Sequence, residues 1–412
     1  MGNGLALRRY VLGVDGGGSK IACLAADENG RLLGFGRGGP CNTNYVPRRE
    51  AQAALQSAVG GALSEAGLHE GQVALLCISA PIEPVTLAEA AHACGIERVV
   101  RAAEGETPRW AARFWIKERV GVTVDAGTGS LARGWAADGR EASAGGWGAT
   151  LGDEGSGYWI AMRAMSAVLQ ARDGRLGETM LSGAVLEHFG LADELDLVFR
   201  ATQGLVREGS DAGAGVGPDS GSESPAGGIG AQGGLHFRQG VPGRAMTRDE
   251  VASLCPVVAQ VARQGDAVAT GILQEAGVEL GRLGSAVIRR LGMEEDTFAV
   301  VPFGGVFRIG EPVMHSFWKT LIATAPRAAA VQPRFEPVVG AVLLALHELG
   351  VEIDAQVIAA LERSSAGLPD VDGLSNGEHS RLGVECAKLH PRAEQALAEE
   401  GFGAEFAVGP EY

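Results

Sequence analysis

Two hydrophobic patterns alternate along the chain: short apolar runs typical of buried strands, and longer runs with helical spacing. The strand-like runs cover residues 11–15, 21–27, 73–80, 120–125 and 298–303. Helical spacing is clearest over residues 48–68, 86–95, 157–172, 310–325 and 336–350. Strands and helices that alternate in this way predict an α/β protein.

An acidic residue ends an apolar strand at two places, and a glycine-rich turn follows each time. The first copy reads VLGVDGGGSK, residues 11–20, and the second reads VGVTVDAGTGS, residues 120–130. Another strand follows the turn in both copies, whereas a Walker loop or a Rossmann turn leads into a helix. The repetition predicts an internal duplication, and so two related α/β domains that face one another.

The two copies and the helices after them set the expected domain boundaries. We expect a first domain over residues 1–117, completed by a helix near 337–350, and a second domain over residues 118–336. Residues 208–237 lose all periodicity and are rich in Gly, Ser, Ala, Asp and Pro, which is typical of a flexible insertion. Residues 351–412 then form a C-terminal extension of polar helix and linker.

Charge and cysteine spacing restrict the possible partners. The 412 residues carry a formal net charge of −15, so the chain has no basic field to attract nucleic acid or an anionic membrane. No uninterrupted apolar segment is long enough to span a bilayer. The six cysteines form no C-x-x-C pair and no zinc-binding spacing, so we expect reduced thiols and a cytoplasmic protein.

Both glycine turns have the composition of a phosphate-binding loop, because glycines let a turn point several backbone N–H groups at one anion. The turn residues are Gly16, Gly17, Gly18, Ser19 and Lys20 in the first copy and Gly127, Thr128, Gly129 and Ser130 in the second. Asp15 and Asp125, at the preceding strand ends, carry oxygens suited to Mg²⁺ beside nucleotide phosphates. The sequence therefore predicts a phosphate chain, with Mg²⁺, clamped between two turns.

Two further motifs have glycines beside chemically useful positions. The block GGWGATLGDEGSGYWI, residues 145–160, places Asp153 and Glu154 just before a helix expected to begin near Ser156. Acids and backbone amides gathered at a helix N-terminus suit the binding of hydroxyls or anions. The strand at 298–303 ends in Gly304 and Gly305, where a flat ring can approach the backbone closely.

Taken together, these motifs resemble the BadF/BadG/BcrA/BcrD ATPase family, and within it the N-acetylglucosamine kinases of the sugar-kinase, Hsp70 and actin superfamily. The resemblance covers most of residues 10–346, and GGWGATLGDEGSGYWI is its most specific block. It implies two ribonuclease-H-like (actin-like ATPase) domains with ATP in a central cleft. It also implies a small-molecule sugar substrate and a homodimer. The implied ATP contacts are Gly17, Gly18 and Ser19, residues 127–130, and Gly304 and Gly305 against the adenosine.

The resemblance also implies the acceptor side of the site. The positions that match the family's sugar-binding residues are Asn42, Asn44, Gly146 and Asp153. The family's catalytic base is an Asp in an N-D-A segment before the second phosphate loop, where this chain has Ala103-Glu104-Gly105. Glu104 can orient the attacking hydroxyl and accept its proton. Glu106 is a nearby alternative.

The function implied is ATP-dependent phosphorylation of a sugar hydroxyl, with an amino sugar such as N-acetylglucosamine or glucosamine as substrate. One alternative is an ATPase that activates a partner protein, as the family's acyl-CoA reductase and dehydratase activators do with a cysteine-ligated iron–sulfur cluster. Cys77, Cys94 and Cys255 lack a recognisable ligand spacing, which disfavours it. The other alternative is an ATP-binding regulator without kinase activity, which the altered N-D-A segment keeps open.

Overall fold

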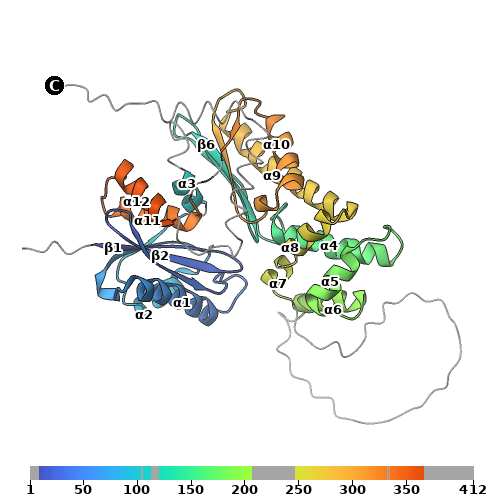
Figure 1. The fold of residues 1–412 in the computed structure, drawn as a ribbon, viewed down its shortest axis with the longest axis horizontal. Coiled ribbons are helices and arrows are strands. Elements are labelled where there is room, and N and C mark those ends of the chain that lie inside the picture. The colour runs from blue at the N-terminus through green and yellow to red at the C-terminus, as the bar shows by residue number, and fades with distance from the viewer. Residues whose placement is uncertain are drawn as a thin grey trace, which may run out of the picture.

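The computed structural model describes residues 9–103, 105–112, 120–206, 246–331, 333 and 335–365. Two β-sheets lie in this part of the chain, each covered by helices, and they form two lobes side by side (Figure 1). The predicted α/β class is confirmed. In the described residues, none of the helices combines the length and the apolar character needed to cross a membrane.

The two sheets have the same topology. The strands of the first are β1 (Tyr10–Gly16), β2 (Ile21–Asp27), β3 (Leu32–Gly38), β4 (Val73–Ser79) and β5 (Val99–Arg101), in the order β3-β2-β1-β4-β5. Those of the second are β6 (Gly121–Ala126), β7 (Ser130–Trp135), β8 (Glu141–Gly145), β9 (Ala299–Phe303) and β10 (Ala329–Ala330), in the order β8-β7-β6-β9-β10. In each sheet three antiparallel strands are followed by two parallel ones. The predicted internal duplication is therefore confirmed.

The five helical runs predicted from the sequence fall close to helices of the structure. Those of the first lobe are α1 (Arg48–Ala66), α2 (Pro84–Ala93), α3 (Glu106–Ala112), α11 (Pro337–Glu348) and α12 (Ala355–Ser365). Those of the second are α4 (Gly157–Arg172), α5 (Leu181–Phe189), α6 (Glu194–Val206), α7 (Arg248–Ala252), α8 (Cys255–Arg263), α9 (Ala267–Leu291) and α10 (Glu311–Ile322). Helix α1 ends at Gly67 in the left-handed conformation, and Ser156 caps α4 by accepting a hydrogen bond from the Trp159 N–H.

Helix α11 returns to the first lobe although it lies near the end of the described chain. It packs on β1, β2, β4 and α3 (Figure 1). The contact with β1 is close, because a Cβ on Gly13 would lie 2.4 Å from the Val342 nitrogen. Helix α12 follows and lies against β3, where the Ser364 hydroxyl accepts a hydrogen bond of 3.0 Å from the Leu32 N–H. The expected first domain includes this helix, and the boundaries of both domains stay a prediction.

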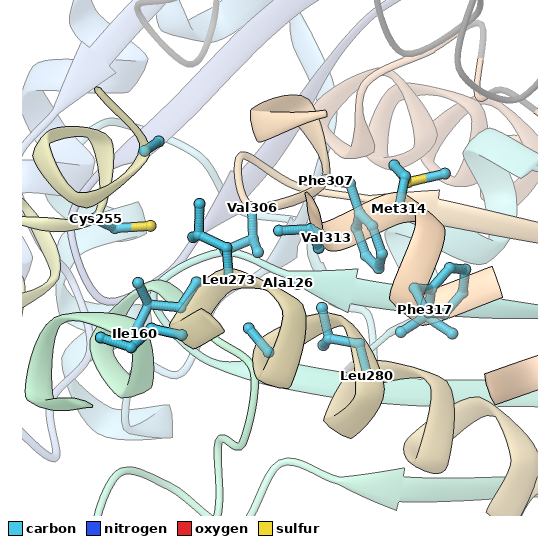
Figure 2. Packing of buried hydrophobic residues seen from close by; sticks show 14 of the residues in the cluster. Ala126, Ile160, Cys255, Leu273, Leu280, Val306, Phe307, Val313, Met314 and Phe317 are labelled. Atoms are coloured by element: carbon cyan, nitrogen blue, oxygen red, sulfur yellow. The ribbon is translucent and has the colours of Figure 1, made fainter. Parts of the chain in front are cut away.

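The core of the second lobe reaches the turn after β9. Figure 2 shows Leu273 and Leu280 of α9 in one cluster with Val306 and Phe317, and all four side chains are buried. The Val306 N–H donates a 3.0 Å hydrogen bond to the carbonyl of Ala126 at the end of β6. This packing holds the Gly304–Gly305 turn against the end of the neighbouring strand.

Candidate active site

A cavity of about 670 Å³ lies between the two lobes, within the size range of small-molecule sites. Its wall is formed by the turns after β1 and β4 and the segment after β5 in the first lobe, and by the turns after β6 and β9 in the second. The carboxyl ends of the parallel strands of both sheets therefore face the same space. Ligands of open α/β sheets bind at such ends.

Each predicted ATP-binding, metal-binding and sugar-binding residue lines this cavity. They are Asp15, Gly17, Gly18, Ser19, Lys20, Asn42, Asn44, Asp125, Gly127, Thr128, Gly129, Ser130, Gly146, Asp153, Gly304 and Gly305. Glu104 lies outside the described residues, although its neighbours Ala103 and Gly105 line the cavity.

Each glycine turn is closed by a backbone hydrogen bond, and the two turns meet across the cavity. The Gly17 N–H donates to the Lys20 carbonyl, and the Gly127 N–H donates to the Gly129 carbonyl, both at 3.0 Å. These two amides close their turns. The turns also touch each other, because the Thr128 hydroxyl donates a 3.3 Å hydrogen bond to the Ser19 hydroxyl.

Asp15 and Asp125 occupy equivalent positions at the ends of β1 and β6, and both line the cavity. The buried Thr107 hydroxyl of α3 donates a 2.6 Å hydrogen bond to Asp15 Oδ1, which fixes this carboxylate. No cluster of three or more His, Cys, Asp or Glu side chains suited to a metal occurs within the described ranges. Two carboxylates without a closed protein cage fit Mg²⁺, which takes its remaining ligands from phosphates and water.

The loop that carries Asn42 and Asn44 is held in place by its own hydrogen bonds. Asn42 is buried, and its Oδ1 accepts a 3.0 Å hydrogen bond from the Asn44 N–H. The Thr43 N–H donates to the Pro81 carbonyl at 3.0 Å, which joins the loop to the end of β4. Across the cavity, the Gly146 N–H donates to the Ser130 carbonyl at 2.9 Å. Gly146 therefore lies directly beside the second glycine turn.

Asp153 has an unusual backbone and an unusual environment. Its φ is 60°, which side-chain-bearing residues adopt rarely and often at functional sites. The residue is 3% exposed, and its Oδ1 accepts a 3.3 Å hydrogen bond from the Ser130 N–H. Burial raises the pKa of the Asp153 carboxyl, while the Arg248 guanidinium acts to lower it.

The structure also brings Arg248 to the site, which the sequence analysis missed. Arg248 is the first residue of α7, forms an ion pair with Asp153 and lines the cavity. In the sequence TRDE, Thr247 and Glu250 predict a capping box, and the structure has one. The local pattern thus explains a helix start, and nothing in it indicates that Arg248 faces a carboxylate ninety-five residues earlier in the chain.

Glu106, the alternative base, is engaged elsewhere. Its carboxylate forms ion pairs with Arg109 at 3.0 Å and Arg133 at 3.6 Å, and both arginines also pair with Glu141. Glu106 is not among the residues that line the cavity. A carboxylate that is already engaged by two guanidinium groups outside the cavity lining is poorly placed to contact a substrate hydroxyl.

Two curated relatives are similar to the chain along nearly their whole length. One is the N-acetylmuramic acid/N-acetylglucosamine kinase of Clostridium acetobutylicum, 28% identical over 346 residues, which cover 82% of this chain and 99% of the relative. The other is the N-acetyl-D-glucosamine kinase of Dictyostelium discoideum, 25% identical over 372 residues, which cover 82% and 98%.

Solved structures show the same fold. A protein of Chromobacterium violaceum that is proposed to be an N-acetylglucosamine kinase superimposes with a TM-score of 0.55 at 24% identity, over 82% of this chain and 99% of the other. A similarly described protein of Porphyromonas gingivalis gives a TM-score of 0.52 at 18% identity, over 83% and 100%. The predicted actin-like ATPase fold is thus confirmed. The family model of the BadF/BadG/BcrA/BcrD ATPases matches residues 12–345, so the chain belongs to the BadF/BadG/BcrA/BcrD ATPase family.

Proposed function

We propose that this protein is an ATP-dependent kinase that phosphorylates a hydroxyl group of an amino sugar such as N-acetylglucosamine or glucosamine. One observation carries the proposal: the glycine turns of both lobes and the four expected sugar-binding residues line a single cavity. The two curated relatives, which are named as kinases of N-acetylated amino sugars, support the same substrate class.

In this proposal, ATP lies with its phosphates between the two glycine turns. The N–H groups of Gly18, Ser19, Thr128 and Gly129 are the proposed donors, since those of Gly17 and Gly127 close the turns. Gly304 has a φ of 95° and lines the same cavity, so its turn can present backbone to the adenosine.

We propose Mg²⁺ as the metal ion, held by Asp15 and Asp125. Such an ion, when bound, neutralises charge on the β- and γ-phosphates. The chain's own contribution is to orient the two carboxylates, and the Thr107 hydroxyl does this for Asp15.

The acceptor sugar is proposed to bind Asn42, Asn44, Gly146 and Asp153, with Glu104 as the base. The sugar hydroxyl oxygen attacks the γ-phosphorus, the bond from that phosphorus to the β–γ bridging oxygen breaks, ADP leaves, and the hydroxyl proton passes to the carboxylate. Two findings support Glu104: its chain neighbours line the cavity, and Glu106 is ion-paired elsewhere.

The proposal is tested by ADP release with Mg-ATP across N-acetylglucosamine, glucosamine, N-acetylmuramic acid and glucose. One sugar should stimulate turnover, and Glu104→Gln should lower kcat by about 100-fold or more with ATP affinity retained. Glu106→Gln is the matched control and should keep most of the activity. Stimulated turnover in Glu104→Gln would refute the base assignment. Bound ATP with no stimulation by any sugar would refute the kinase.

The described cysteines do not favour the partner-activating alternative. Cys77 and Cys255 are buried in separate hydrophobic clusters, and burial raises the pKa of each thiol to about 12. Two thiols buried in separate cores cannot ligate one iron–sulfur cluster.

We further propose a cytoplasmic homodimer that binds neither nucleic acid nor membrane. The net charge of −15 supports the second point, because it repels polyanions. Sedimentation over a hundredfold range of protein concentration tests the first. A single species with the mass of one chain throughout would exclude the dimer.

A further inference from the structure

A buried ion pair lies at the acceptor side of the cavity. The side chains of Arg248 and Asp153 are 11% and 4% exposed, and they are joined between Nη2 and Oδ2. Both residues line the cavity. A buried pair of this kind contributes little net stability, since desolvation offsets most of the attraction. Its presence beside a ligand cavity therefore calls for another explanation than stability.

The guanidinium of Arg248 is held from both lobes. It lies 4.8 Å from the centroid of the Tyr45 ring, in the loop between β3 and α1, and 5.9 Å from that of Tyr158 on α4. Its Nη2 also donates to the Thr128 carbonyl of the second glycine turn at 3.4 Å. Its Nε is buried and finds no hydrogen-bond partner in the described part of the chain. These contacts fix the direction of the positive charge.

We propose that Arg248 is a positioning residue for the acceptor sugar, which holds the Asp153 carboxylate ionised and oriented so that it accepts hydrogen bonds from sugar hydroxyls. The inference rests on the proposed function, in which Asp153 binds the sugar. A buried carboxyl without a cation takes up a proton, and one of its oxygens then becomes a donor. Hydrogen bonds to an ionised carboxylate are also about twice as strong as neutral ones.

Several groups around Asp153 affect the protonation of its carboxyl, and together they determine the effect of removing Arg248. The Arg248 charge and the Ser130 N–H favour the ionised carboxyl, whereas burial and the charge of the neighbouring Glu154 favour the protonated one. Burial also raises the pKa of Asp249, the next residue on α7, to about 6, and Arg248 opposes this rise. A variant of Arg248 therefore affects two carboxyls, and Asp153→Asn separates them.

The kinetic test compares Arg248→Gln and Arg248→Lys with Arg163→Gln. Arg163 is a matched control, because it also pairs with a carboxylate, Glu275, and stacks on an aromatic ring, that of Trp159, but on the surface. At low pH, kcat/KM for the sugar should decline as Asp153 takes up a proton, and this decline is the acid limb of the pH profile. In Arg248→Gln, the acid limb should move up by about 1–3 pH units. The sugar KM should rise about tenfold while the ATP KM changes less than about twofold. Arg248→Lys should recover part of both effects, and Arg163→Gln should match the wild type.

A second measurement does not depend on catalysis. Thermal unfolding of the wild type, Arg248→Gln, Asp153→Asn and the double variant is followed from pH 4 to pH 8. Without Arg248 the folded-state pKa of Asp153 lies further above its unfolded value, so stability falls further as pH rises. The Tm gap between wild type and Arg248→Gln should widen with pH. The gap between Asp153→Asn and the double variant should widen much less, with Asp249 accounting for the rest.

The outcomes distinguish this inference from the proposed function. A widening Tm gap in a protein that phosphorylates no sugar would support the ionisation of Asp153 by Arg248 and refute the kinase. An active kinase with an unmoved acid limb and a constant Tm gap would overturn the role of Arg248. An equal rise of both KM values with an unmoved acid limb would overturn it as well.

Discussion

Gly304 illustrates how strictly single positions are constrained around the cavity. Its φ is 95°, and a Cβ there would lie 2.4 Å from the Ala126 carbonyl oxygen, whereas a Cβ on Gly305 would contact nothing within 4 Å. Gly304→Ala should therefore destabilise the fold by about 2 kcal/mol or more and weaken ATP binding. Gly305→Ala should change the free energy of unfolding by less than about 0.5 kcal/mol. Denaturant unfolding of both variants checks this, and equal stabilities would contradict it.

Asp249 should make stability depend on pH. Its pKa of about 6, raised chiefly by burial, lies above the ordinary value of 3.8. Below about pH 4 the carboxyl is protonated in the folded and the unfolded chain, and its contribution to stability is complete. As pH rises from about 4 through 6, the unfolded chain releases this proton while the folded chain still holds it, so stability falls.

Asp249→Asn should flatten this decline by on the order of 1 kcal/mol, since the site is partly solvated. Tm measured at half-unit steps between pH 4 and pH 7 gives the comparison. A parallel decline in both proteins would show that Asp249 does not titrate in this window.

At the residue scale, the sequence identified the groups whose signal is local. Asp15 and the glycines after it could be found because a strand, an acid and a turn follow one another within ten residues. Arg248 could not be found, because its partner lies in a distant segment and a buried charge pair leaves no mark on either local pattern. Glu104 was indicated by resemblance alone.

At the scale of elements, the close crossing of α11 and α3 connects the end of the described chain to the site. A Cβ on Gly340 would lie 2.0 Å from the Thr107 carbonyl oxygen, and the Thr107 hydroxyl holds Asp15. Gly340→Ala should separate the two helices, cost about 1–3 kcal/mol of stability and lower kcat/KM for Mg-ATP.

The matched control is Gly271→Ala on α9, where a Cβ would meet nothing within 4 Å. Alanine is the better helix former, so this variant should be stabilised by about 0.5–1 kcal/mol with unchanged kinetics. Unfolding curves and initial rates decide both predictions. Unchanged kinetics in Gly340→Ala would show that α11 does not act on Asp15 through α3.

The strand and helix ranges that the sequence predicted agree with the structure, because each of these elements buries one continuous apolar pattern. Helix α4 begins at Gly157, as the block around Asp153 indicated, and α1 ends where Gly67 allows a left-handed residue. The sequence did not predict α7 as a separate helix, because five residues are too few to establish a helical period. Its position at the cavity is set by tertiary packing.

For the molecule as a whole, two lobes with a cavity between them predict closure on ligands. The two glycine turns belong to different lobes and can both contact one phosphate chain only if the lobes stay close. A non-hydrolysable ATP analogue with sugar should therefore lower the radius of gyration in small-angle X-ray scattering more than either ligand alone. No compaction with both ligands would show that the cavity is already closed.

The sequence by itself determined the α/β class, the duplicated strand–turn–strand unit and most of the cavity lining, because these depend on short-range hydrophobic periodicity and on glycines at strand ends. Only the tertiary structure decided which side chains oppose one another. It paired Arg248 with Asp153 and Glu106 with Arg133. Each of these contacts joins segments distant in the chain, and their energies depend on burial and direction in space, which no local pattern encodes.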